Sequence, residues 1–129
     1  VPKGKITCAI NMDQIGYTLE PVHEGIKDYL IILGENTLKK EDRGKIGLCN
    51  RFYNIHLDID YTFYSSEAFT TLYYKLSDQV AFQEAQIPAL LLTSGFHSHT
   101  YKISDDIDLI SYPTLKKRTV LVFYFVMML

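Results

Sequence analysis

Short apolar runs divide this chain and predict buried β-strands. Residues 6–15 read ITCAINMDQI, a run rich in strand-forming residues that closes at Gly16. Residues 28–33 (DYLIIL) are nearly all apolar and stop at Gly34, and residues 87–93 (IPALLLT) form a third run of the same kind. Such uninterrupted apolar strands are typical of a sheet that is covered on both faces.

The segments between these strands predict helices and one irregular stretch. Residues 38–53 can form a helix capped by Asn36 or Thr37, although Gly44 and Gly47 weaken it. Residues 55–64 are strand-like or irregular, and a tyrosine-rich segment follows them up to residue 74.

Two further helices are predicted in the second half of the chain. Ser77 has the position of an N-cap for an amphipathic helix that ends near Gln86. Residues 111–113 (SYP) open a final helix through Leu129, with Pro113 in its first turn. Strands that alternate with helices indicate an α/β domain with a mostly parallel or mixed sheet.

The loop that follows the third strand concentrates the polar chemistry. Residues 94–108 (SGFHSHTYKISDDID) are dense in His, Tyr and Asp, and they follow directly on a buried strand. Enzymes of the α/β class place their functional groups on such loops, because the strands hold the loop ends rigidly. We therefore expect the site within residues 77–108.

Length and charge narrow the classes of function. A chain of 129 residues, 47% of them hydrophobic, suits one soluble globular domain, residues 1–129. A net charge of −2 argues against nucleic acid as a partner, because there is no basic stripe to neutralise phosphates. The apolar run at residues 120–129 is about half the length of a membrane span, so we expect a buried helix there and no span. Two cysteines are too few for a disulfide scaffold.

The ends of the chain have no processing or capping signals. The sequence begins VPKG, without an initiator methionine or signal peptide, and ends inside an apolar run without a polar tail. We expect from this that it is a piece of a longer protein.

Four ordered segments resemble one enzyme family. These are NMDQIG (residues 11–16), SDQVAF with IPALLL (residues 77–92), SGFHSHTYKISDDIDLI (residues 94–110) and the closing YPTLKKRTVLVFY. In this order they resemble the C-terminal half of the two-zinc aminopeptidases of metallopeptidase family twenty-eight. The resemblance implies an α/β fold of the zinc-exopeptidase kind, with a three-layer, mixed or mostly parallel sheet and helices on both faces, present here in incomplete form.

The resemblance also implies roles for particular positions. Asp13 matches the zinc-ligand Asp of the family's N-x-D-x-I-G motif. Gln79 stands where the family has a histidine near the substrate. Tyr101 takes the position of a second ligand histidine, Thr100 that of the tyrosine before it, and Ile103 that of a usual proline. Asp13 is thus the expected metal position, and Gln79, Thr100 and Tyr101 are the expected substrate-binding positions.

Two nearby histidines offer another way to bind a metal. His97 and His99 are spaced to share one face of an extended segment, and imidazole is a good zinc ligand. They could act with Asp13 if the loop register slipped. The plainer interpretation, which we favour, is that both are solvent-facing loop residues, since the resemblance puts Tyr101 at the ligand position.

The family's other metal ligands and catalytic residues precede the matched region: a ligand histidine, a bridging Asp and a Glu-Glu pair. They have no counterpart here. A pair of zinc ions needs several ligands and a carboxylate base. We therefore expect no hydrolysis of peptides by this chain alone, and we leave open whether it binds zinc. The first hypothesis is a portion of an aminopeptidase, with a peptide as substrate when complete. The alternatives are a non-catalytic binding or scaffold domain and a dimerising piece. The partner of the chain is left open between a missing N-terminal half and a second copy in a homodimer.

Overall fold

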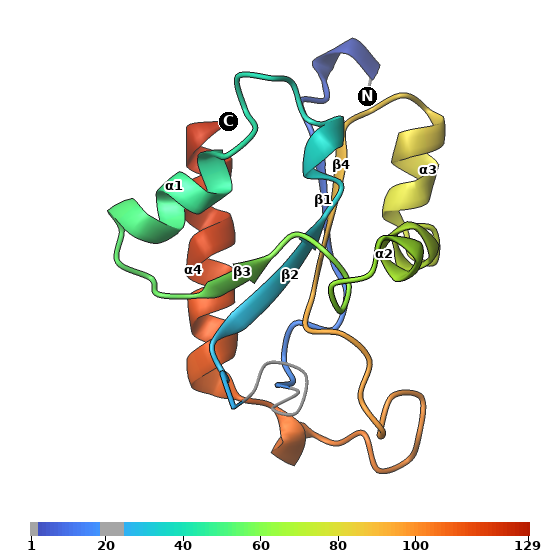
Figure 1. The fold of residues 1–129 in the computed structure, drawn as a ribbon, viewed down its shortest axis with the longest axis vertical. Helices are drawn as coiled ribbons and strands as arrows, with labels where there is room; N and C mark the ends of the chain where they lie inside the picture. The colour runs from blue at the N-terminus through green and yellow to red at the C-terminus, as the bar shows by residue number, and fades with distance from the viewer. Residues whose placement is uncertain (1–2, 19–24) are drawn as a thin grey trace.

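The computed structural model describes residues 3–18 and 25–129, and in it four strands form one mixed sheet (Figure 1). The strands are β1 (Ala9–Met12), β2 (Tyr29–Leu33), β3 (Asp58–Asp60) and β4 (Ala89–Thr93), in the order β1-β4-β2-β3. β1 pairs with β4, and β2 with β3, in parallel. β2 and β4 pair in antiparallel fashion at the centre of the sheet.

Helices cover both faces of this sheet. Helices α1 (Lys45–Phe52) and α4 (Tyr112–Met128) lie on one side, and α2 (Glu67–Tyr74) and α3 (Gln79–Glu84) lie on the other (Figure 1). Short 3-10 turns occur at Lys3–Lys5, Glu35–Thr37 and Ile107–Leu109. The predicted three-layer α/β architecture with a mixed sheet is thereby confirmed.

The alternation of side chains along β2 divides the core in two. Leu30 and Ile32 pack with Leu121 and Phe125 of α4. The other three residues of the strand, with Phe63 and Tyr74, form the second cluster, on the side of α2. All five residues of β2 are buried, as expected of a central strand with a helix layer on each face. The almost unbroken apolar sequence of β2 therefore follows from its place in the sheet.

The first predicted strand and the first predicted helix are shorter in the structure than in the prediction. Only Ala9–Met12 of residues 6–15 pair as a strand, and beyond its carboxyl end Gln14 adopts a left-handed conformation with φ 60° that ends the extended run. The helix expected over residues 38–53 begins at Lys45, because Gly44 before it is also left-handed, with φ 79°. Turns replace the first part of that helix.

The tyrosine-rich segment is a helix that the sequence did not predict as one. Ser66 caps α2, and its Oγ accepts a hydrogen bond of 3.4 Å from the backbone N–H of Phe69. Tyr74 ends this helix with its ring in the core and its hydroxyl donating to the carbonyl of Ala89 at 2.6 Å. Tertiary packing of Tyr74 thus overrides the strand-like composition of the segment.

The predicted N-cap at Ser77 is wrong. Asp78 precedes α3 and makes no side-chain cap bond, whereas the hydroxyl of Ser77 binds a carboxylate on another element. The final helix agrees with its prediction, with Pro113 in the first turn of α4. Within the described residues no helix is long and apolar enough to span a membrane.

Candidate functional site

Asp13 stands at the carboxyl end of β1. Its backbone N–H donates to the carbonyl of Leu92 at 3.0 Å, so the residue is still tied to β4. The next residue, Gln14, turns the chain, and its carbonyl accepts bonds from the backbone and the hydroxyl of Ser94. The parallel strands β1 and β4 therefore deliver Asp13 and the loop after β4 to the same edge of the sheet.

A chain of hydrogen bonds holds the carboxylate of Asp13 in place. The Ser77 hydroxyl donates to Oδ2 of Asp13 at 2.6 Å, and Nδ2 of Asn11 donates to Oγ of Ser77 at 2.8 Å. The same amide nitrogen donates to Oε1 of Gln79 at 3.0 Å, and Nε2 of Gln79 donates to the carbonyl of Tyr74. Bonds of this kind fix the orientation of a carboxylate.

Gln79 is the side chain of this network that is farthest from Asp13 along the chain of hydrogen bonds. It is fully buried, at 0% exposed, and hydrogen bonds through Asn11 and Ser77 connect it to Asp13. Sequence reasoning singled out Gln79 but missed Asn11 and Ser77 as functional positions. A signal was present, because both are polar residues inside the two motifs that flank the site.

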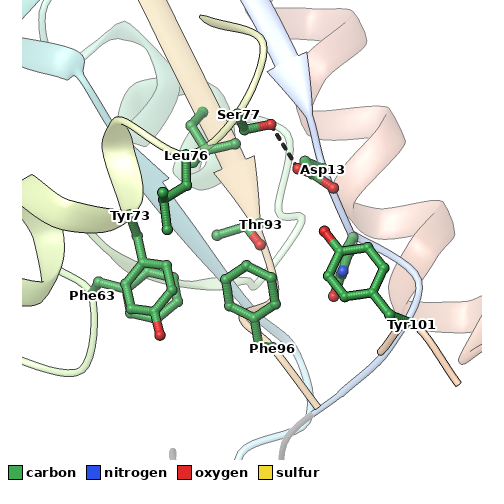
Figure 2. A pocket seen from close by; sticks show the side chains of 10 residues that line it. Asp13, Phe63, Tyr73, Leu76, Ser77, Thr93, Phe96 and Tyr101 are labelled. Atoms are coloured by element: carbon green, nitrogen blue, oxygen red, sulfur yellow. Dashed lines mark hydrogen bonds between the residues drawn. The ribbon is translucent and has the colours of Figure 1, made fainter. Parts of the chain in front are cut away.

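Asp13 lines a small pocket of about 30 Å³ beside a cluster of aromatic rings (Figure 2). The ring of Tyr73 stacks on Phe63 at 4.0 Å between centroids and lies 5.1 Å from the ring of Phe96. The figure shows Asp13 and Tyr101 on one side of the view and Phe63 and Tyr73 on the other. The pocket is lined by Asp13, Gln14, Phe63, Tyr73, Leu76, Ser77, Leu91, Thr93, Phe96 and Tyr101.

The loop after β4 brings Tyr101 to this pocket and Thr100 to its edge. Tyr101 is left-handed, with φ 62°, and 92% exposed, and its ring lines the pocket together with Asp13. Thr100 anchors the loop, because its hydroxyl donates to Oε1 of Gln14 at 3.2 Å and accepts from the backbone N–H of His97 at 3.2 Å. The two expected substrate-binding positions therefore have different places in the structure: Tyr101 faces the pocket, whereas Thr100 anchors the loop.

The two histidines lie apart from the pocket that Asp13 lines. The side chain of His97 is only 5% exposed, stacks on Tyr17 at 4.1 Å and places Nε2 3.9 Å from Oδ1 of Asp105. Burial lowers the pKa of His97, with Asp105 opposing that effect. Nδ1 of His99 lies 3.0 Å from the Ser104 hydroxyl. His97 is therefore a packed residue that supports the loop rather than a solvent-facing one.

The donor set of the pocket does not fit a pair of zinc ions. Within residues 3–18 and 25–129 no three His, Cys, Asp or Glu side chains are grouped so that they could hold a metal ion. Among the described lining residues Asp13 is the one carboxylate, and the lining side chains of Gln14, Thr93 and Tyr101 are an amide, a hydroxyl and a phenol. A two-zinc site needs several anionic or imidazole ligands.

The fold is that of solved aminopeptidases. No family model matches the sequence, and no curated protein matches it. The structure is similar to the LapA aminopeptidase of Legionella pneumophila, with a TM-score of 0.68 and 17% identity over 94% of this chain and 30% of that one. It is also similar to BSAP, a zinc aminopeptidase from Bacillus subtilis, with a TM-score of 0.67 and 16% identity over 96% of this chain and 28% of that one. The chain thus has the fold of part of these enzymes and spans less than a third of their length.

Proposed function

We propose that this chain is the C-terminal portion of a two-zinc aminopeptidase domain of metallopeptidase family twenty-eight. In this proposal Asp13 is the one metal-ligand position that the chain supplies, and the loop after β4 forms part of the wall of a peptide-binding pocket. The observation that carries it is the placement of Asp13, which lies at the carboxyl end of β1 with Ser77 orienting its carboxylate towards the pocket.

Hydrolysis needs groups beyond those in the pocket. A metal-activated water requires ions held by several ligands, and a carboxylate base must take its proton. Asp13 alone cannot meet these needs, so we propose that residues 1–129 do not cleave peptides by themselves. The fold neighbours are more than three times as long as the part they share with this chain, which supports the need for further protein.

The residue at the second ligand position makes zinc binding weaker still. The side chain of Tyr101 at this position is a phenol. The phenol replaces an imidazole that would bind zinc readily. We assign Tyr101 to the substrate side of the pocket, with Gln79 and Thr100 as residues that position Asp13 and the loop.

A non-catalytic binding domain is the second candidate. The feature that favours it is the aromatic wall of the pocket, where Phe63, Tyr73 and Phe96 remain packed together beside a single carboxylate. A binding module needs this surface and needs no metal. The coding sequence upstream of residue 1 separates the two candidates: a ligand histidine, a bridging Asp and a Glu-Glu pair there support the peptidase, and their replacement supports the binding domain.

Zinc titration followed by calorimetry tests the assignment of Asp13 and Tyr101. We expect the wild-type chain to show no tight binding of two ions, and Tyr101→His to bind zinc at least about tenfold more tightly than wild type. Histidine tolerates the left-handed backbone at this position. Adding Asp13→Asn to Tyr101→His should remove the gain.

The matched control is Tyr112→His, which makes the same change at an exposed residue of α4 outside the pocket. It should leave zinc affinity at the wild-type level. Tight binding of two ions by the wild-type chain refutes the proposal that it cannot hold the metals alone. Equal affinities for Tyr101→His and Tyr112→His refute the placement of Tyr101 at the ligand position.

A further inference from the structure

The outer side of the layer formed by α1 and α4 carries large apolar side chains that remain exposed in the described part of the chain. Phe52 is 78% exposed, Met127 72% and Phe123 60%. Three further residues are between 40% and 49% exposed and, together with Phe52, line a hollow of about 320 Å³. We call the whole set the outer patch: Leu48, Phe52, Tyr53, Phe123, Met127 and Met128.

Ring contacts join the two helices into one surface. The rings of Tyr53 and Tyr124 are stacked, with centroids 3.5 Å apart and an interplanar angle of 7°. Phe52 meets Tyr53 edge to face at 5.0 Å, and Phe123 meets Tyr124 in the same way at 5.5 Å. Phe123 and Met127 are four positions apart in α4, so they are neighbours on the helix surface. The outer patch is therefore continuous, unlike the single apolar residues that are scattered over most protein surfaces.

Contacts beneath the outer patch hold the two helices together. Nζ of Lys45 donates to the carbonyl of Met128 at 2.9 Å and pairs with Oδ1 of Asp42 at 2.6 Å. Sγ of Cys49, which is buried, lies 3.0 Å from Sδ of Met128. The surface is thus already formed in the single chain, and a preformed surface loses little conformational freedom when it binds.

Area and composition point to a second copy of the chain as the partner. With about 200 Å² for a fully exposed side chain of this size, the exposed fractions give the outer patch roughly 600–700 Å². Two such patches that cover each other bury roughly 1,200–1,400 Å² in total, above the roughly 1,000 Å² expected of a specific interface. Neither α1 nor α4 contains an Asp or Glu, and the outer patch consists of aromatic, methionine and leucine residues. Such an uncharged composition, rich in aromatic residues and methionine, is typical of the core of a homodimer interface.

We propose that two copies of this chain associate through their outer patches in a two-fold symmetric dimer. Two-fold symmetry brings the same patch of each copy together, and the hollow of about 320 Å³ in one copy has room for an aromatic ring of the other. Helix α2, whose Tyr73 lines the pocket of Asp13, lies on the opposite face of the sheet (Figure 1). The dimer therefore leaves that pocket accessible, and its existence does not depend on the proposed function.

Sedimentation equilibrium of the full chain tests the association. We expect the mass to rise from 14.9 kDa to twice that value, and no further, as the concentration is raised to about 100 µM. NMR spectra of the 15N-labelled chain should show dilution-dependent shifts at the backbone amides of Leu48, Phe52 and Phe123 and none at Thr93. A mass that stays at 14.9 kDa overturns the proposal. A mass that grows beyond the dimer overturns the two-fold pairing, because only a head-to-tail contact continues to add copies.

Variants test whether the outer patch is the surface that associates. Phe52→Glu and Phe123→Glu should each weaken dimerisation by about tenfold or more, because the symmetric interface would bury the new carboxylate twice. Both rings are largely exposed in the single chain, so the urea midpoint of the monomer should stay at the wild-type value. Leu72→Glu is the matched control, since it makes the same kind of change at an exposed residue of α2, and it should dimerise as wild type does. Unchanged dimerisation of both Phe variants overturns the proposal.

A lipid surface is the other occupant that the measurements distinguish. Sedimentation with phosphatidylglycerol vesicles should leave the wild-type chain in the supernatant. Binding to these vesicles that Phe52→Glu abolishes, without a dimer in solution, would assign the outer patch to a membrane surface and overturn the second copy as its partner.

Discussion

Arg118 ties the last helix to the segment that follows Asp13, and its replacement should destabilise both. The side chain is fully buried. Its Nε donates to the carbonyl of Tyr29 at 2.8 Å, and its Nη1 donates to the carbonyls of Ile15 and Tyr17 at 2.5 and 2.8 Å. The guanidinium also lies 5.1 Å from the centroid of the Tyr29 ring. Ile15 and Tyr17 follow the left-handed Gln14 next to Asp13, so these bonds fix the segment just after Asp13.

The loss of stability on removing the guanidinium is the contribution of its hydrogen bonds minus the penalty for burying its charge. Three hydrogen bonds from a charged donor contribute roughly 1.5–3 kcal/mol each, or roughly 5–9 kcal/mol together. Burial lowers the pKa of Arg118 to about 10, which means that burying the charge costs about 3 kcal/mol. Among the described residues Nη2 finds no acceptor, which adds to that cost. The difference leaves roughly 2–6 kcal/mol of net stabilisation, and Arg118→Met should lose an amount in this range because three carbonyls then lose the bond from the guanidinium.

Urea unfolding followed by far-ultraviolet circular dichroism measures the effect on the free energy of unfolding. Arg118→Lys should lose less than Arg118→Met, because an ammonium group can still reach one or two of the carbonyls. Lys116→Met makes a similar change at an exposed position of the same helix and should stay within about 0.5 kcal/mol of wild type. If Arg118→Met is as stable as Lys116→Met, the guanidinium does not hold the loop, and the reasoning from its three bonds is wrong.

Two more predictions concern the backbone and the pH dependence of stability. Gly34→Ala should lower the free energy of unfolding by at least about 2 kcal/mol, because φ is +90° and the new Cβ would lie 2.4 Å from the carbonyl oxygen of Ala89. Gly4→Ala, which has open space around it, is the control. Equal urea midpoints for the two variants would contradict the prediction. Asp28 accepts a hydrogen bond from Lys117, which lowers the pKa of its carboxyl group, so its contribution to stability is present above about pH 4 and is lost as the pH falls through the folded-state pKa. The melting temperature of Asp28→Asn should therefore lie below that of wild type at about pH 6 and equal it at about pH 2, and a difference that persists at about pH 2 would show another cause.

The strands could be predicted because the runs of apolar residues that indicate them are local features of the sequence. The apolar run that became β2 is buried on both faces, and the pattern alone indicates such burial. The tyrosine-rich segment that became α2 has no such local signal. Its helix depends on the cap at Ser66 and on Tyr74, whose hydroxyl binds a carbonyl on β4. Strand-like composition was therefore overridden by contacts that a single sequence does not show.

The error at Ser77 has the same origin. A serine just before an amphipathic helix is a usual N-cap, but a hydroxyl can donate as well as accept. Here the carboxylate of Asp13, far away in the sequence, accepts a hydrogen bond of 2.6 Å from that hydroxyl, and Asn11 donates to the hydroxyl oxygen. The local rule failed at a position that belongs to the candidate site, where a long-range polar partner competes with the cap.

The resemblance located Asp13 and Tyr101 but left the chemistry between them open. Both residues line one pocket, so their juxtaposition agrees with a shared role, yet the aromatic cluster opposite them had no part in the motif. No histidine is among the described lining residues of the pocket, so position 101 is where an imidazole ligand beside Asp13 has to be introduced. If zinc binds tightly to the Tyr101→His variant and not to the wild-type chain, then the identity of residue 101 decides whether this pocket binds a metal.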